Sequence, residues 1–226
     1  AKLVEASAVV PESLDEDDVL WGPEDDPACA SLRDPALAPR SPDAGLWLFY
    51  TCEGPGPAAI RALPLESRIG LRVADGATPV TVVDPNLLGD FGQDGVSGPE
   101  PIIDFFTVGE GGDEREASVL RLWFLARSNV RGTSVGLAVG EAVADAPGGA
   151  LPLPLLQPYP ANPVLSADPQ GDCPGCTLQG FGVTRDTDAA RRNRLRFLVA
   201  RRVPLAGGGR RYELVPFEQP WVLIER

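Results

Sequence analysis

The chain contains no histidine and no methionine, and only four cysteines occur among its 226 residues. Without histidine there is no Ser-His-Asp or Cys-His triad, no histidine general base and no histidine-ligated metal centre. No Gly-x-Gly-x-x-Gly segment follows an expected strand and opens a helix, and no glycine-rich phosphate loop ends in Lys and Ser or Thr. These absences exclude most hydrolase classes and leave nucleotide chemistry without support. Chemistry that carboxylates alone can perform remains.

Positive charge is scarce as well. The chain has 20 Lys and Arg against 32 Asp and Glu, a formal net charge of −12. Binding to nucleic acid or to an anionic membrane surface requires clustered basic residues, so we expect neither partner. No apolar run approaches the roughly 18 residues of a membrane-spanning helix. We interpret residues 1–17 as a solvated acidic lead-in and not as a calcium site, because the glycine-punctuated spacing of an EF-hand loop is missing.

Long helices are disfavoured by the 25 glycines and 24 prolines, which together favour short strands and turns. Three apolar runs resemble one another, at residues 46–52, 120–127 and 195–201, and their matching leucines are Leu48, Leu122 and Leu195. Each run has an extended segment before it and another after it. This spacing indicates an internal repeat of about 74 residues, which is typical of a β-propeller blade.

The predicted fold is therefore all-β and propeller-like, with about three four-stranded repeats in residues 18–226. The repeat units are expected at residues 18–77, 78–160 and 161–226. Closed propellers have about four to eight blades, so three repeats predict a partial or split propeller. Because open sheet edges promote aggregation, we expect a protein partner or long loops to complete or cover the sheet edges.

The cysteines predict two disulfides. Cys29 and Cys52 lie at the same open end of an expected hairpin, and Cys173 and Cys176 flank a Pro-Gly turn. A zinc site and a thioredoxin-type redox motif are the alternatives, but no histidine assists a zinc ion and no helix follows the second pair. Disulfides persist in oxidising compartments, so we expect a protein that is secreted, periplasmic or on the cell surface.

Several segments together resemble the blade pattern of the five-bladed propeller glycoside hydrolases, the group of arabinanases, xylosidases and invertase-like enzymes. They are residues 33–37 followed by 45–51, residues 120–124 with 134–139, and residues 159–165. The resemblance implies a glycan ligand, no cofactor and no metal. It also implies that acids on the innermost strand of successive blades act as base, tuning group and proton donor.

Two acid-Pro pairs match that position, and they make Asp34 the candidate base and Glu100 the candidate acid or tuning group. Asp104 shares a strand face with Glu100 if the strand is regular, and we include it as a third candidate. The third repeat has Gln179 and Gly180 where an acid is expected. Acids before proline also cap turns by accepting hydrogen bonds from nearby backbone N–H groups, and this alternative stays open for Asp34.

Three further residues are candidate ligand contacts. Trp47 and Trp123 lie in expected strands, where they would either stack on sugar rings or pack between blades. Arg127 would clamp a carboxylate-bearing ligand or form a surface ion pair. We therefore expect an exported protein that binds a glycan, and hydrolysis of that glycan by paired carboxylates stays open. The alternative is a non-catalytic extracellular interaction or assembly subunit, because propellers carry unrelated functions.

Overall fold

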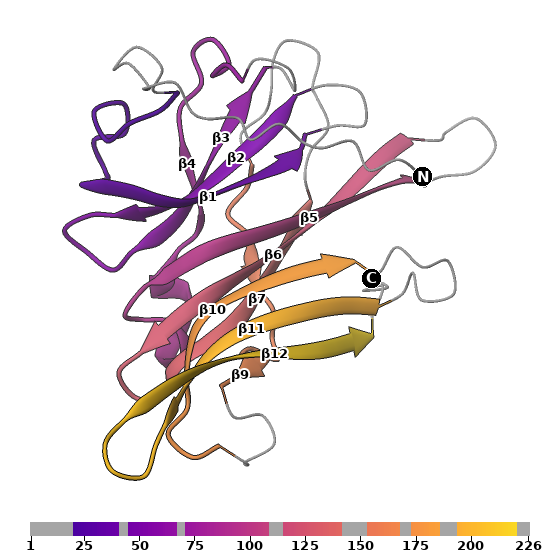
Figure 1. The fold of residues 1–226 in the computed structure, drawn as a ribbon. Coiled ribbons are helices and arrows are strands. Elements are labelled where there is room, and N and C mark those ends of the chain that lie inside the picture. The colour runs from indigo at the N-terminus through magenta and orange to yellow at the C-terminus, as the bar shows by residue number, and fades with distance from the viewer. Residues whose placement is uncertain are drawn as a thin grey trace, which may run out of the picture.

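The computed structural model shows an all-β protein, and the residues that it describes form three antiparallel sheets and two short 3₁₀ turns (Figure 1). Each sheet is built from strands that are consecutive in the chain. The structure describes residues 20–40, 45–66, 71–108, 115–141, 153–167, 173–185 and 194–220. Among these residues, no helix is long and apolar enough to cross a membrane.

Sheet 1 has the strand order β1-β2-β3-β4, and sheet 2 has the order β5-β6-β7-β8, with β9 also pairing with β7. Sheet 3 has the order β10-β11-β12. Sheet 1 contains β1 (Ser31–Pro39), β2 (Leu46–Glu53), β3 (Ala59–Leu65) and β4 (Val80–Val83). Sheet 2 contains β5 (Val96–Val108), β6 (Arg115–Ser128), β7 (Gly132–Glu141), β8 (Gln157–Pro158) and β9 (Leu165–Ser166), and sheet 3 contains β10 (Thr177–Arg185), β11 (Arg194–Pro204) and β12 (Arg210–Pro220). The 3₁₀ turns η2 (Pro85–Leu87) and η3 (Gly89–Phe91) connect sheets 1 and 2.

The all-β prediction is confirmed, and the propeller-like repeats of four strands stay a prediction. The described sheets contain four, five and three strands, and none of them closes on itself. Sheet 2 gains a strand because two separate short segments pair with different parts of β7. The expected boundaries of the repeat units stay predictions, and the acidic lead-in at residues 1–17 lies outside the described residues.

Sheet 2 is the central layer of the molecule (Figure 1). One apolar core lies between sheets 1 and 2 and contains Phe49 and Phe124, both fully buried. A second core lies between sheets 2 and 3 and contains Trp123 and Phe197. These two rings pack edge to face with centroids 6.1 Å apart. Because alternate residues of β6 point to opposite faces, one strand supplies side chains to both cores.

The two outer faces of this stack differ. The outer face of sheet 1 is covered, because Leu20 and Trp21 pack against a buried cluster that includes Tyr50 and Leu63. No described residue covers the outer face of sheet 3. Its apolar side chains are largely exposed, at 50% for Leu198, 70% for Tyr212 and 68% for Leu214.

Both predicted disulfides are confirmed. Cys29 bonds to Cys52 and Cys173 bonds to Cys176, with Cα–Cα distances of 5.2 Å and 5.6 Å. The first joins the segment before β1 to the end of β2, and the second closes a tight turn before β10. Two disulfides are compatible with an oxidising compartment.

Candidate functional site

The first strands of the three sheets, β1, β5 and β10, line a common open groove of about 550 Å³. It brings together two predicted site residues from different sheets, Asp34 on β1 and Glu100 on β5. Arg33 lines the groove beside Asp34, and Gln179 and Gly180 line it from β10. The groove therefore holds two carboxyl groups, one guanidinium and one amide.

A local irregularity positions these residues. Each first strand has one residue more than its partner strand at the groove, so its register shifts there. The shift lies between Arg33 and Ala36 in β1, and between Ser97 and Glu100 in β5. In β10 it lies between Leu178 and Gly180. Such bulges redirect side chains and often border functional sites.

Asp34 lies inside the first bulge with a φ of 53°, in the left-handed region that residues with a Cβ rarely adopt. Its Oδ2 accepts a hydrogen bond from the Thr51 hydroxyl at 3.0 Å and one from the backbone N–H of Gly98 at 3.2 Å. The second bond crosses from sheet 2 to sheet 1. Among the described residues, none hydrogen-bonds to Oδ1, and the side chain is 39% exposed. One oxygen thus links the sheets, and the other is left without a hydrogen bond to the described residues.

The bulges show which positions of β1 and β5 are structurally equivalent, and these differ from the positions matched in the sequence. Asp34 corresponds to Gly98, because both lie in the bulge and both have positive φ, 53° and 60°. Glu100 instead corresponds to Ala36, the first paired residue after the bulge. The prediction that Asp34 and Glu100 occupy matching acid-Pro positions is therefore wrong by two residues, although both side chains reach one groove.

Glu100 differs from Asp34 in its surroundings. Its side chain forms no hydrogen bond or ion pair with any residue in the described part of the chain. Its carboxyl group is partly buried, and this burial raises its pKa above the ordinary value. Its Oε1 lies 4.0 Å from the position that a Cβ on Gly182 would occupy, so the side chain extends toward β10.

Asp104 does not line the groove. It forms ion pairs with Arg121 of β6 and Arg185 of β10, and its side chain is 18% exposed. Burial lowers the pKa of Arg121, and the neighbouring Asp104 carboxylate opposes that change. The geometry is that of a link between sheets 2 and 3, and it engages the Asp104 carboxylate away from Glu100.

The other three candidates are also absent from the groove lining. Trp47 and Trp123 are 1% and 2% exposed and belong to the cores between the sheets, so their burial disfavours stacking on a ligand. Arg127 is exposed near the end of β6 and is absent from the groove lining. Ligand contact by these three residues stays a prediction, and their positions in the structure do not favour it.

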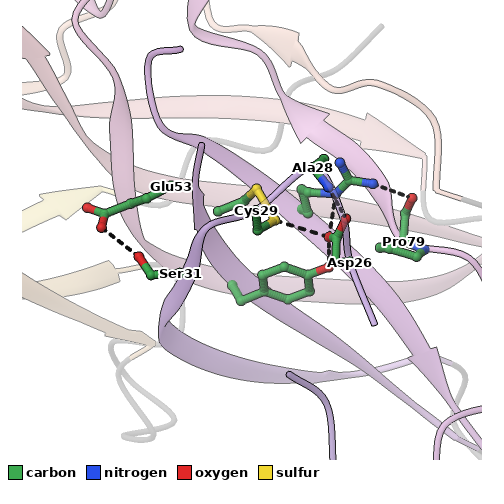
Figure 2. The surroundings of a disulfide bond; sticks show 9 residues. Asp26, Ala28, Cys29, Ser31, Glu53 and Pro79 are labelled. Carbon is green, nitrogen blue, oxygen red and sulfur yellow. Dashed lines mark hydrogen bonds and ion pairs between the residues drawn. A yellow bond between two sulfur atoms is a disulfide. The ribbon is translucent and has the colours of Figure 1, made fainter. Parts of the chain in front are cut away.

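A second group of polar residues lies around the Cys29–Cys52 disulfide, where the segment before β1 meets sheet 1 (Figure 2). Asp26 is 1% exposed, accepts a hydrogen bond from the Tyr50 hydroxyl at 2.7 Å, and lies 3.0 Å from the Arg61 Nε. Burial and the Asp26 carboxylate raise the pKa of Tyr50. The Sγ of Cys29 is 3.2 Å from Asp26, but both cysteines here are in the disulfide, so they provide no thiolate for a metal ion.

No protein-family model and no curated protein matches the chain. The groove therefore has to be interpreted from its own residues. Sequence reasoning missed Thr51 and Gly98, which hold Asp34 in place. The available signal was the pair of Pro residues at 35 and 99, which follow the two left-handed positions.

Proposed function

We propose that the groove between β1, β5 and β10 binds a glycan in an exported protein. The observation that carries this proposal is that Asp34 and Glu100, from two different sheets, line one open groove. Sugar hydroxyls are hydrogen-bond donors, and carboxylates are strong acceptors for them. Gln179 offers both a donor and an acceptor on the opposite strand.

Two features of the acids support recognition of a ligand. The Asp34 backbone adopts a conformation unfavourable for a residue with a Cβ, and such outliers cluster at functional sites. Glu100 is partly buried without a described partner, so a ligand hydroxyl would supply the missing hydrogen bond. Its raised pKa also suits a general acid, with Asp34 as the base that activates water.

Binding and hydrolysis are separable in one experiment. The full chain is titrated calorimetrically with arabinan, xylan and fructan oligosaccharides, and released sugar is measured on the same samples. We expect binding by the parent protein and at least a ten-fold loss of affinity in Glu100→Gln and in Asp34→Asn. Asp90→Asn is the matched control, because Asp90 is exposed and lies outside the groove.

The result decides between two levels of function. Binding with sugar release that is lost in both acid variants supports hydrolysis. Binding without release supports a glycan-binding protein. No binding to any of the oligosaccharides, with the fold intact by circular dichroism, overturns the proposal.

A second candidate function, an extracellular interaction or assembly subunit, is favoured by the uncovered face of sheet 3. Tyr212 and Leu214 are largely exposed there, and exposed apolar patches often mark protein interfaces. Sedimentation equilibrium of the parent and of Leu214→Arg tests it for self-assembly. A concentration-dependent oligomer of the parent that is lost in Leu214→Arg supports this candidate. A monomer in both the parent and the variant counts against it.

A further inference from the structure

A smaller hollow, of about 200 Å³, lies beside the groove at the outer face of sheet 1. It is lined by Trp21, Leu32, Arg33, Pro35, Leu48 and Tyr50. Arg33 and Pro35 also line the groove. Both belong to β1, which pairs with β2 alone and is the edge strand of sheet 1 in the described part of the chain. The hollow and the groove are therefore neighbours along one strand edge.

We propose that this hollow binds an aromatic group carried by the glycan, while the sugar to which that group is attached lies in the groove. This inference rests on the proposed glycan-binding function. It adds the class of glycan, one substituted with an aryl ring, and the place where the ring binds.

The composition of the hollow gives the first argument. Five of its six lining residues present apolar or aromatic surface, and two of them, Trp21 and Tyr50, have aromatic rings. The Tyr50 hydroxyl is already engaged, because it donates a hydrogen bond to Asp26 at 2.7 Å. A sugar in this hollow would lose hydrogen bonds to water with little replacement, whereas an aryl ring has none to lose. The groove, with two carboxyl groups and one amide, favours the sugar.

The state of Arg33 gives the second argument. It is the one charged residue among those that line the hollow. Its guanidinium lies 2.7 Å from the Glu53 carboxylate and 3.9 Å from that of Asp34, so its charge is compensated within sheet 1. The hollow is therefore poorly suited to an anionic group. A paired guanidinium keeps its planar faces, and these stack on aromatic rings.

The size of the hollow agrees with a substituent and not with a whole ligand. Complete ligand sites are typically about 300–1,000 Å³. The groove, at about 550 Å³, falls within that range, and the hollow, at about 200 Å³, falls below it. One ligand with a larger polar part and a smaller aromatic part would occupy both.

The Trp21 side of the hollow is fixed before any ligand binds. In the same segment, Asp26 is 1% exposed and is held by Tyr50 and Arg61. Cys29 joins this segment to the end of β2. A binding surface that is fixed in advance loses less conformational entropy when the ligand binds. The buried carboxylate and the disulfide thus do more than cover sheet 1, because they also keep the indole at the hollow.

The test uses the full chain and matched trisaccharides of arabinose, xylose and fructose. Each carries either a methyl or a benzyl group, attached at the reducing end in one series and at the non-reducing end in another. Affinities are measured by titration calorimetry. We expect at least one benzyl compound to bind about ten-fold more tightly than its methyl counterpart, because its ring buries apolar surface.

Three variants locate the ring. Trp21→Ala removes one side of the hollow and should abolish the benzyl gain, with the affinity for the methyl compound unchanged. Leu32→Phe fills the hollow and should abolish the gain without removing a side chain. Leu87→Ala is the matched control, because Leu87 is exposed, apolar and outside both linings, and it should retain the gain. Thermal unfolding of each variant checks that the fold is retained.

The outcomes are distinct. Equal affinity within every benzyl and methyl pair overturns this inference, while binding of the methyl compounds keeps the proposed function. A benzyl gain that persists in either folded hollow variant places the ring elsewhere and also overturns the inference. Absence of binding by every compound overturns both.

Discussion

The two outer faces of the sheet stack differ in solvent exposure, because the face of sheet 1 is covered and the face of sheet 3 is not. On sheet 1, Tyr50 and Cys52 are 3% and 6% exposed, because residues before β1 lie over them. On sheet 3, Tyr212 and Leu214 are 70% and 68% exposed. Both faces carry apolar side chains, so composition alone does not separate them. The difference lies in what holds a cover in place.

The cover over sheet 1 is held by a buried carboxylate and a disulfide. Asp26 lies among Tyr50, Arg61 and the backbone N–H of Ala28, so its charge is compensated. Glu100, at the edge of the open face, has no such partners among the described residues. The covered face of sheet 1 thus has an acid whose charge is compensated by neighbouring groups. The acid beside the exposed face of sheet 3 has no such neighbours among the described residues.

Breaking the cover at its carboxylate should have the largest effect. Asp26→Ala leaves the Arg61 guanidinium and the Tyr50 hydroxyl without their shared acceptor. Removing one partner of a buried ion pair costs about 3–5 kcal/mol of unfolding free energy. Urea denaturation measures the change, and Glu24→Gln, an exposed neighbour, should change the unfolding free energy by less than about 0.5 kcal/mol. A loss below about 1 kcal/mol in Asp26→Ala would contradict the role assigned to Asp26.

The two disulfides should differ in their contribution to stability. They join cysteines separated by 23 and by 3 residues. In the chain-entropy description the longer loop gives about 3 kcal/mol of stabilisation and the shorter about 2 kcal/mol. We expect the double variant C29A/C52A to lose more stability than C173A/C176A in the same denaturation experiment. A larger loss from the second pair would show that the cover is not the more strongly constrained element.

The smallest effect is expected from Glu100, and it depends on pH. Burial raises its pKa in the folded protein, so ionisation opposes folding once the pH exceeds the unfolded value. The stability associated with the protonated form is complete below the unfolded pKa and is lost as the pH rises through the folded pKa. Glu100→Gln should therefore be slightly more stable than the parent at pH 7, by less than about 0.5 kcal/mol, and equal to it at pH 3. Thermal unfolding across this range checks the sign, and a less stable variant at pH 7 would show that the carboxylate has a stabilising partner.

Much of the fold was predictable because strand patterns depend on nearby residues. The runs around Leu48 and Leu122 occupy equivalent positions in β2 and β6, opposite Leu37 and Pro101. The third match was misplaced: the equivalent residue is Val199, opposite Phe181, and not Leu195. A shift of an even number of residues keeps every side chain on its face, so apolar alternation alone cannot detect it.

The site was predictable only in part. Asp34 and Glu100 were identified from their proline neighbours, yet the bulges that bring them to one groove depend on pairing between strands. The cluster of Asp26 and Arg61 had no sequence signal, because its members are distant in the chain and meet only after sheet 1 forms. Asp104 was selected by strand alternation, which does not reveal the two arginines that engage it.

The order of the strands has a consequence for synthesis of the protein. Sheet 1 is complete within residues 31–83, and sheet 3 requires no strand that precedes Thr177. Each sheet can form as soon as its own segment has left the ribosome, since its pairing partners are close in sequence. The groove exists only after the last sheet has docked, so an unfinished chain would carry folded sheets without the groove.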